Sequence, residues 1–362
     1  MNILIEISHP AHVYKLLATI NILEANGNKI IVVTKDINSI KYLLSKFDVP
    51  FTVLGRKKDS LLGKAFFQLL YNVRCFFILK KQKIDLMIGS LTSSYMTRIT
   101  NVPSILMDDD DDEVEPLMVK YVHPYISTIL SPDALINKRK RKDTIYYAGY
   151  HELGYLHPNR FSPDVSILNE IGVKEGESYF VLRFNVFKAH HDIGVHGLSL
   201  ENKRKLIHFL EKRGRVFITT ERNIDEEFKK YQLILSQEKV HSLLYYATMF
   251  IGDSQTMTSE ACVLGTPAIR SNSFVGRIAY LEEEEHKYGL TYGFLPNEFD
   301  ALQSKIEELL AMNNLKDVWQ ERRRKMLVDK IDVTAFYVWF IENYPTSIIT
   351  MKENPDYQYR FK

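Results

Sequence analysis

The chain has 362 residues, of which 45% are apolar and 25% are charged, and its formal net charge is +2. This length accommodates two domains with hydrophobic cores of their own. The near balance of charge argues against a dedicated nucleic-acid-binding protein, which usually carries a strong basic excess. Two cysteines, Cys75 and Cys262, are too few for a disulfide framework or a cysteine zinc cluster, and they fit a reducing cytoplasm. The chain starts in a predicted strand, without the layout of a signal peptide, and it has no apolar run long enough to span a bilayer.

The first elements predict a parallel sheet. An apolar strand at residues 2–7 is followed by a turn, a helical pattern over residues 12–26 and a second strand at residues 29–34. This strand–helix–strand spacing is a βαβ unit, which implies parallel strands. His9 and His12 follow the first strand, at the carboxyl end where α/β sheets usually bind ligands. A purely structural role for the two histidines is the alternative.

A run of five acidic residues, 108–112, directly follows a later strand. Further strands are predicted at residues 51–54, 85–89, 104–107 and 126–130. A run of charges is usually a solvated loop, and a linear run rarely supplies the converging ligands of a metal site, so no metal is predicted. Because the run starts at a strand end, Asp108, Asp109 or Asp110 is a candidate acceptor-side group or base.

Residues 60–83, SLLGKAFFQLLYNVRCFFILKKQK, form a long helical pattern with aromatic and aliphatic side chains on much of its surface and basic residues at intervals. We expect a buried crossover helix, because a parallel sheet needs such helices to cover it. In that case Phe66, Phe67, Phe76 and Phe77 are buried. The alternative is peripheral contact with a membrane, since basic residues beside aromatic ones favour anionic interfaces.

The middle of the chain separates two domains. Residues 146–164 contain two glycines and two prolines and are predicted to be turn and linker, which places a domain boundary near residue 165. A second parallel sheet begins with a strand at residues 179–183. Arg183, at the carboxyl end of this strand, is a candidate ligand for a diphosphate. The polar loop that follows contains Lys188, His190 and His191.

The rest of the second half alternates helices with strands. Helices are predicted at residues 200–212, 225–235, 241–247 and 297–312, and a strand is predicted at residues 216–220. An amphipathic helix at residues 332–343 follows, and its apolar positions include Phe336, Trp339 and Phe340.

The stretch from Thr248 to Arg270 has the most specific pattern in the chain. It predicts a strand, a polar turn at residues 253–255, a helix from about residue 256 to residue 264, and a second strand. Gly265 occupies the usual position after a helix, and Pro267 blocks its continuation. Free N–H groups and the helix dipole make the start of such a helix a ready site for an anion.

Four polar residues accompany this helix start. Ser254, Gln255 and Thr256 add side-chain donors, and Glu260 lies over a turn further along, where a carboxylate can accept two sugar hydroxyls. The alternative is ordinary capping, because serine and threonine often start helices, with Glu260 as a solvated surface residue.

These residues carry a family resemblance. The segment GDSQTMTSEACVLGTPAIR resembles the donor-nucleotide motif of GT-B glycosyltransferases, including the N-acetylglucosaminyltransferase of peptidoglycan synthesis, and of the non-hydrolysing UDP-N-acetylglucosamine 2-epimerases. The resemblance implies that Ser254, Gln255 and Thr256 hold the diphosphate and that Glu260 holds the ribose. Over about residues 1–345 the chain is similar to a GT-B-like family described only as a domain of unknown function, through SHPAHV, GYHELGYLHPNRFSPD and GDSQTMTSEA.

The predicted fold is therefore α/β and GT-B-like, with two Rossmann-like parallel-sheet domains facing each other across a cleft. Residues 1–165 are expected to form an acceptor domain and residues 166–330 a nucleotide-sugar domain. Residues 331–362 are expected to form a helix that crosses back onto the first domain, followed by a tail.

The predicted function is that of a glycosyltransferase of surface polysaccharide synthesis. The predicted location is the cytoplasm, with peripheral binding at the inner face of the membrane as the alternative. A nucleotide sugar, of the UDP class, is the donor substrate, a glycan or lipid-linked molecule is the acceptor, and no further cofactor is expected. His12, His9 or an aspartate such as Asp109 is expected to deprotonate the acceptor, and Arg183 to stabilise the leaving diphosphate. The alternatives are a UDP-N-acetylglucosamine 2-epimerase-like enzyme and a non-catalytic sugar-nucleotide-binding protein.

Overall fold

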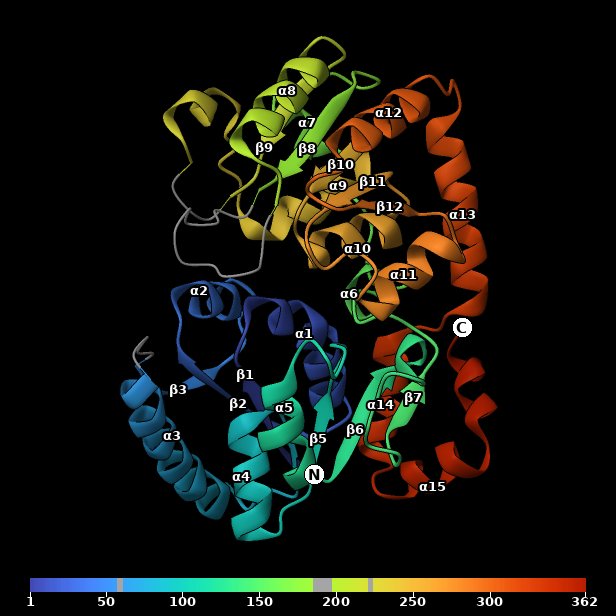
Figure 1. The fold of residues 1–362 in the computed structure, drawn as a ribbon. Coiled ribbons are helices and arrows are strands. Elements are labelled where there is room, and N and C mark those ends of the chain that lie inside the picture. The colour runs from blue at the N-terminus through green and yellow to red at the C-terminus, as the bar shows by residue number, and fades with distance from the viewer. Residues whose placement is uncertain (57–60, 185–196, 221–223) are drawn as a thin grey trace. The chain divides into compact units, whose positions relative to one another are not determined.

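The computed structural model describes residues 1–56, 61–184, 197–220 and 224–362, and it divides the chain into two compact units (Figure 1). Unit 1 comprises Met1–Arg160 and Lys330–Lys362, and unit 2 comprises Phe161–Asp329. The boundary between the two units thus falls after Arg160. The sequence analysis had placed it near residue 165. The C-terminal segment belongs to unit 1, because its aromatic residues are buried there and the Tyr337 hydroxyl donates a hydrogen bond to the Tyr147 hydroxyl at 2.8 Å.

The sheet of unit 1 has seven parallel strands in the order β3-β2-β1-β4-β5-β6-β7. The strands are β1 (Asn2–Ile7), β2 (Lys29–Asp36), β3 (Phe51–Arg56), β4 (Leu86–Ile88), β5 (Ser104–Met107), β6 (Thr128–Pro132) and β7 (Ile145–Tyr147). The sequence prediction missed β7, because its three residues are too few to show a periodic pattern and the expected linker began within it.

From β1 the chain first adds β2 and β3 on one side, and it then adds β4 to β7 on the other side of β1. This change of direction determines which face of the sheet each helix covers. Right-handed crossovers place the helices between β1 and β3 on one face of the sheet and those between β3 and β6 on the other. The helices of unit 1 are α1 (Pro10–Ala25), α2 (Asn38–Lys46), α3 (Leu61–Gln82), α4 (Leu91–Thr100), α5 (Pro116–Tyr121), α6 (Leu153–Leu156), α14 (Val333–Glu342) and α15 (Thr346–Glu353). The core beneath α3 contains Leu4, Val33, Tyr71, Cys75 and Met87.

The sheet of unit 2 has five parallel strands in the order β12-β11-β10-β8-β9. The strands are β8 (Tyr179–Arg183), β9 (Arg215–Ile218), β10 (Met249–Gly252), β11 (Ala268–Ser271) and β12 (Thr291–Phe294). The helices are α7 (Ser166–Glu170), α8 (Leu200–Glu211), α9 (Val240–Tyr246), α10 (Gln255–Leu264), α11 (Ala279–His286), α12 (Phe299–Leu310) and α13 (Leu315–Asp329).

One predicted helix of unit 2 is wrong. Residues 225–235 form only a short 3₁₀ segment, Glu226–Tyr231, instead of an α-helix. The chain then becomes extended, because Gln232 forms a bridge with Ile218 and the Leu233 N–H donates to the Ile218 carbonyl at 2.9 Å. Pairing with the end of β9 therefore outweighs the local preference for a helix.

Candidate functional site

The turn after β10 lies beside the end of β8. Gly252 pairs with Arg183 in the parallel register, and the Asp253 N–H donates to the Arg183 carbonyl at 3.1 Å. A Cβ atom at position 252 would lie 2.4 Å from that carbonyl oxygen, so only glycine permits this approach. The structure thus brings Arg183, the sequence-predicted cation, to the same sheet edge as the polar turn that begins α10.

Ser254 caps α10. Its Oγ accepts a hydrogen bond from the Met257 N–H at 3.3 Å, which is the capping role that was the alternative to ligand binding. Capping uses the acceptor capacity of the hydroxyl and leaves its O–H as a donor. Ser254, Gln255 and Thr256 are all half-buried, and the first N–H groups of α10 lack acceptors within the helix. The edge therefore combines a helix N-terminus with side-chain donors.

Glu260 is buried, and the interpretation of it as a solvated surface residue is wrong. It lies four residues after Thr256 and hence on the same face of α10. Its Oε1 is 3.1 Å from His241 Nε2, and His241 is a buried residue of α9. This contact fixes the orientation of the carboxylate, and the histidine was not singled out from the sequence.

The first turn of α1 carries the two sequence-predicted histidines of unit 1. His9 is the N-cap residue, and its Nδ1 accepts a hydrogen bond from the Ala11 N–H at 3.2 Å. His12 is half-buried, and the His12 and His9 ring centroids are 6.0 Å apart. Burial and the nearby Lys15 ammonium lower the pKa of His12 to about 3. The His12 imidazole is therefore neutral near pH 7, and a pKa this low also makes it a weak base.

Asp109 lies in a buried network of charged groups. Its Oδ1 is 3.1 Å from Lys15 Nζ and its Oδ2 is 2.7 Å from His151 Nδ1, while His151 Nε2 is 3.1 Å from Glu152 Oε1. Burial opposes charge here, but the two cations outweigh it and hold the pKa of Asp109 well below its usual range. Burial likewise opposes protonation of His151, but Asp109 and Glu152 outweigh it and raise the His151 pKa to about 9.

This pairing bears on the choice of a base. The Asp109 carboxylate is shared between an ammonium and an imidazolium, which favours a positioning role over proton removal. Its neighbour Asp110 has an exposed side chain, and desolvation together with the carboxylates of Asp109 and Asp108 raises its pKa to about 7. A carboxyl group with that pKa exchanges protons near neutral pH.

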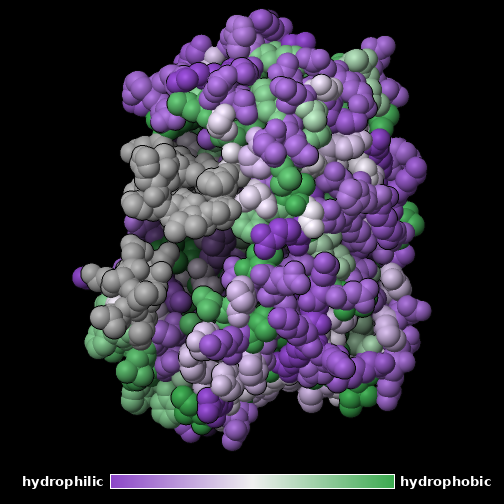
Figure 2. Space-filling model, in the orientation of Figure 1, coloured by the Kyte–Doolittle hydropathy of each residue, from purple (hydrophilic) through white to green (hydrophobic). Residues whose placement is uncertain are grey.

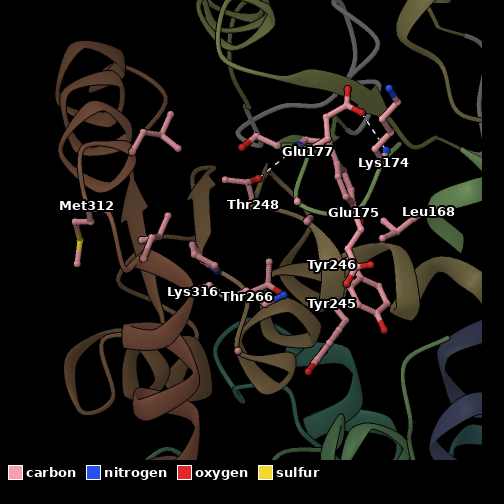
Figure 3. Close-up of a pocket in the computed structure, with 18 of the residues that line it drawn as sticks. Leu168, Lys174, Glu175, Glu177, Tyr245, Tyr246, Thr248, Thr266, Met312 and Lys316 are labelled. Carbon is pink, nitrogen blue, oxygen red and sulfur yellow. Dashed lines mark hydrogen bonds between the residues drawn. The ribbon is translucent and has the colours of Figure 1, made fainter. Parts of the chain in front are cut away.

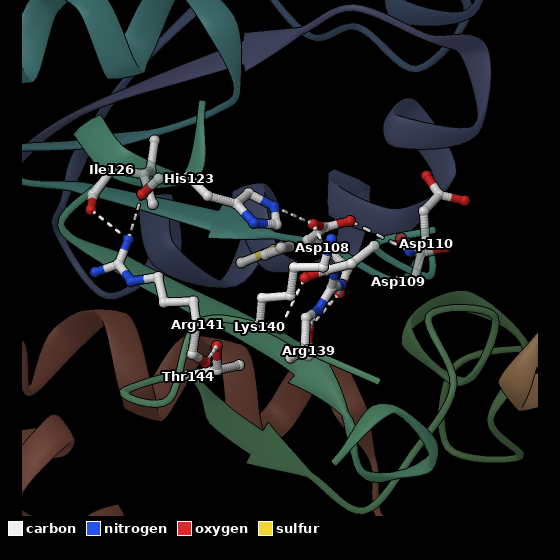
Figure 4. Close-up of polar contacts among 12 residues, drawn as sticks. Asp108, Asp109, Asp110, His123, Ile126, Arg139, Lys140, Arg141 and Thr144 are labelled. Carbon is white, nitrogen blue, oxygen red and sulfur yellow. Dashed lines mark hydrogen bonds and ion pairs between the residues drawn. The ribbon is translucent and has the colours of Figure 1, made fainter. Parts of the chain in front are cut away.

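The rest of the acidic run is not a solvated loop, which corrects the sequence interpretation. Asp108, Asp111 and Asp112 are buried. Arg139 Nη1 lies 2.7 Å from Asp112 and 3.0 Å from Asp108, as Figure 4 shows around Asp108. This pairing was not predicted, because Arg139 lies in a short basic segment, residues 137–143, whose pattern does not indicate a buried partner.

The sequence analysis also missed Lys15, the partner of Asp109. Lys15 follows Tyr14 on a helix whose neighbouring positions Leu16, Thr19 and Ile20 are buried. A charged residue on a buried face needs a partner of opposite charge. The position of Lys15 on the apolar face of this helix could therefore have predicted a buried ion pair. A small cavity of about 30 Å³ borders His12 and Lys15, a volume that suits about one water molecule.

A second helix N-terminus, that of α4, lies at the carboxyl edge of unit 1 and is occupied by the protein itself. The Glu6 carboxylate accepts hydrogen bonds from the N–H groups of Ser90 at 3.1 Å, Thr92 at 3.3 Å and Ser93 at 3.0 Å, and from the Ser93 hydroxyl at 2.9 Å. A Cβ atom at Gly89 would lie 2.6 Å from the Glu6 Cβ, so the close approach requires glycine. These polar residues therefore serve a structural carboxylate.

A larger hollow of about 500 Å³ lies at the opposite, amino-terminal edge of the unit 2 sheet (Figure 3). Its lining includes Tyr245, Tyr246, Thr248, Thr266 and Lys316. It contains none of the sequence-predicted site residues, so the largest of these spaces is separate from the candidate donor site. The predicted basic group Lys188 and the pair His190 and His191 lie outside the described residues.

Comparisons with known proteins agree with this architecture. The family described as "Protein of unknown function (DUF354)" matches residues 1–289. A comparison with curated proteins gives no significant match.

Solved structures show the same fold. The S. aureus MnaA–UDP co-structure has a TM-score of 0.68 at 13% identity, covering 96% of this chain and 98% of that chain. The Neisseria meningitidis UDP-GlcNAc 2-epimerase bound to UDP-GlcNAc has a TM-score of 0.67 at 12% identity, covering 95% of this chain and 100% of that chain. The glycosyltransferase SsfS6 of Streptomyces sp. SF2575 gives 0.59 at 11% identity, covering 95% and 100%. The predicted GT-B-like fold with two parallel α/β sheets is confirmed.

Proposed function

The chain belongs to the DUF354 family, and we propose that it transfers a sugar from a nucleotide-sugar donor, of the UDP class, to a glycan or lipid-linked acceptor. The observation that carries the proposal is the position of Arg183 directly beside the turn that begins α10. A guanidinium group and free helix N–H groups at one sheet edge are suited to a diphosphate. The similarity in fold to structures that hold UDP or UDP-GlcNAc supports the same choice.

The donor half of the proposed reaction uses unit 2. Arg183 and the N-terminus of α10, with Ser254 and Gln255, bind the diphosphate, and these groups stabilise the negative charge that develops as it leaves. Thr256 and Glu260 face the ribose from one side of the helix, with His241 fixing the carboxylate. In this proposal protein groups neutralise the leaving diphosphate, and no metal or further cofactor takes part in the step.

The acceptor half uses the carboxyl edge of unit 1. Neutral His12 accepts the proton of the acceptor hydroxyl, His9 lies in the same helix turn, and the Lys15–Asp109–His151 network keeps this edge in place. Asp110 is the competing base and the stronger of the two, because its pKa is about 7 and that of His12 is about 3. The pH profile separates the two: turnover that depends on Asp110 falls below about pH 7, whereas His12 stays neutral down to about pH 3.

The proposed cellular role is surface polysaccharide synthesis on the cytoplasmic side, including acceptors held at the inner face of the membrane. A polysaccharide-building enzyme that uses nucleotide sugars needs its donor from the cytoplasm and its acceptor from a growing glycan or lipid carrier. The division of groups between the two units fits such a two-substrate reaction.

The test is a binding and turnover panel of nucleoside diphosphates and their sugars, measured by calorimetry and product analysis. We expect UDP and at least one UDP-sugar to bind, and absence of binding by any nucleoside diphosphate overturns the proposal. His12→Ala should lower turnover by about a hundredfold while donor affinity is retained, because loss of a general base has that size of effect. Collapse of donor affinity in this variant would instead place His12 at the phosphates.

A second candidate is UDP-N-acetylglucosamine 2-epimerisation, which the similarity to two structures with that activity in their names favours. An epimerase needs no acceptor, so conversion of UDP-N-acetylglucosamine alone distinguishes it from a transferase. Tight nucleotide binding without turnover across a broad acceptor panel would indicate a non-catalytic sugar-nucleotide-binding protein.

A further inference from the structure

The crossover helix α3 has two apolar faces, and only one of them is buried. Tyr71, Cys75 and Leu79 lie against the sheet. On the opposite side, Phe66 and Phe77 are 59% and 65% exposed, which corrects the expectation that the phenylalanines of this helix are all buried. An amphipathic crossover helix normally presents polar residues to solvent. The outer face of α3 therefore departs from what coverage of the sheet requires.

The exposed residues form a continuous stripe. Phe66, Leu69, Val73 and Phe77 are spaced by three or four residues, so they lie one above another along the helix. Lys80, a further three residues along, is exposed and continues the same line. We call these five residues the α3 stripe. Apolar surface gathers at the lower left of Figure 2, where Figure 1 places α3.

Exposed apolar residues extend onto the neighbouring helices. α4 packs beside α3, and its Ile99 is 61% exposed. α5 follows on the same face of the sheet and exposes Leu117 and Tyr121. The stripe on α3 is the continuous part of this exposed apolar surface, and such a patch on a folded protein marks an interaction site more often than scattered single residues do.

The charges on this face have one predominant sign. α3 contains no aspartate or glutamate over Leu61–Gln82, and its last turn carries exposed Lys80 and Lys81, followed by exposed Lys83. Lys80 Nζ lies 5.7 Å from the centre of the Phe76 ring, so cation and aromatic ring share one end of the helix. Asp85, the next acid in the chain, accepts a hydrogen bond from the Asn2 N–H at 2.7 Å.

We propose that the α3 stripe and the lysines at its end form a peripheral contact with an anionic lipid surface. Phenylalanine and leucine enter the boundary between headgroups and acyl chains, while lysines reach the phosphates. The positive charge is complementary to such a surface and specifies it over a neutral apolar partner. None of the helices in the described ranges is long and apolar enough to cross a membrane.

The lipid contact would place the proposed sugar transfer at a membrane surface. A transferase that is held at a membrane by α3 meets a lipid-linked acceptor there, and this link rests on the proposed function. The lipid contact itself does not depend on sugar transfer. Vesicle binding and UDP binding are therefore measured separately, so failure of one does not count against the other.

The test is flotation of the full chain with vesicles of phosphatidylcholine, with and without phosphatidylglycerol, at low and high salt. We expect binding that rises with the phosphatidylglycerol fraction and falls with salt. Replacing Lys80, Lys81 and Lys83 with Gln should weaken binding by about a hundredfold, because each cation near such a surface contributes roughly a factor of five. Phe66→Ser with Phe77→Ser should also release the protein, and both are exposed, so folding is retained.

The matched control replaces three exposed lysines of unit 2, Lys205, Lys229 and Lys230, with Gln, which changes the net charge equally. This variant should float like the unchanged protein, and every variant should keep its thermal midpoint. Absence of vesicle binding at every composition and salt concentration overturns the proposal. Equal loss in the control also overturns it, and so does self-association through Phe66 and Phe77 without vesicle binding.

Discussion

In both sheets a helix begins beside the end of the first strand, but the neighbouring strand residue is an acid in unit 1 and a base in unit 2. In unit 1 the turn after β4 begins α4, and in unit 2 the turn after β10 begins α10. Each turn lies beside the first strand of its own sheet, β1 or β8. At the end of β1 the neighbouring side chain is Glu6, which is buried and accepts four hydrogen bonds from the start of α4. At the end of β8 it is Arg183.

A helix N-terminus is available to an external anion only where no carboxylate of the protein already occupies its first N–H groups. Glu6 neutralises the positive end of the α4 dipole and satisfies its first N–H groups, so no anion is needed there. At the start of α10 the capping group is instead the neutral hydroxyl of Ser254, which accepts a hydrogen bond from the Met257 N–H. Arg183 makes the same edge more attractive to an anion.

The largest effect is expected from removing the internal carboxylate. Glu6→Gln should lower the free energy of unfolding by about 4 kcal/mol, because a buried amide cannot accept all the hydrogen bonds that the carboxylate accepts. Denaturant unfolding at pH 7 measures the loss. Glu24→Gln, at an exposed position of α1, is the matched control and should change stability by less than about 0.5 kcal/mol. A loss below about 1 kcal/mol for Glu6→Gln would mean that solvent replaces the carboxylate.

The second prediction concerns the buried network of Lys15, Asp109, His151 and Glu152 in unit 1. The pKa of His151 is raised from 6.5 to about 9, so the folded state holds its proton more tightly than the unfolded chain does. The contribution of His151 is fully present below about pH 6.5 and is lost as pH rises through about 9, with a full size on the order of 3 kcal/mol. Unfolding titrations from pH 6 to pH 9.5 should show this fall.

The control for this titration is His151→Gln, which removes the titrating group. Its unfolding free energy should be lower at pH 6 and should change less between pH 6.5 and pH 9. An identical pH dependence in the two proteins would show that His151 is not held as an imidazolium by Asp109 and Glu152.

The third prediction concerns the cation of unit 2. Arg183→Gln should weaken UDP binding by about 2 kcal/mol, or roughly thirtyfold, because a charge-assisted contact to a phosphate is lost. Titration calorimetry measures the affinity. Arg213→Gln, at an exposed position in the turn after α8, is the charge-matched control and should bind UDP normally. Unchanged affinity in Arg183→Gln would remove this residue from the donor site and with it the contrast between the two sheet ends.

Strong local signals account for the parts of the fold that the sequence predicted. The helix after Ser254 was placed within one residue, because a cap, Gly265 and Pro267 bound it. Apolar runs located most of the strands in the same way. The buried acidic run was not predicted, since the partner of Asp112 is Arg139, which is distant in sequence. Sequence separation hides such pairs, because neither residue shows a periodic pattern that points to the other.

The outer face of α3 illustrates a different limit. Phe66 and Phe77 look the same in sequence as the half-buried Phe67 and Phe76, because apolar residues occupy more than one face of this helix and so do not indicate which face is buried. The catalytic predictions have a similar limit. The sequence places His12 at a strand end, but the lowered pKa arises from burial and from Lys15, and Lys15 pairs with Asp109 from the loop after β5.

The smallest effect is expected from converting the unit 2 turn towards the state of the unit 1 turn. Ser254→Asp places a carboxylate at the start of α10, where aspartate is as good a cap as serine, so stability should change by no more than about 0.5 kcal/mol. The same charge competes with a diphosphate and should weaken UDP binding by about 1 kcal/mol, or roughly fivefold. Ser254→Asn is the matched neutral cap and should keep the affinity of the unchanged protein, because asparagine caps without a charge. Calorimetry measures the UDP affinity of both variants at low and high salt. It separates the effect of the added charge from that of the altered side-chain shape, because only the loss caused by aspartate should shrink with salt. Equal affinities for the Asp and Asn variants would show that the N-terminus of α10 does not contact the diphosphate.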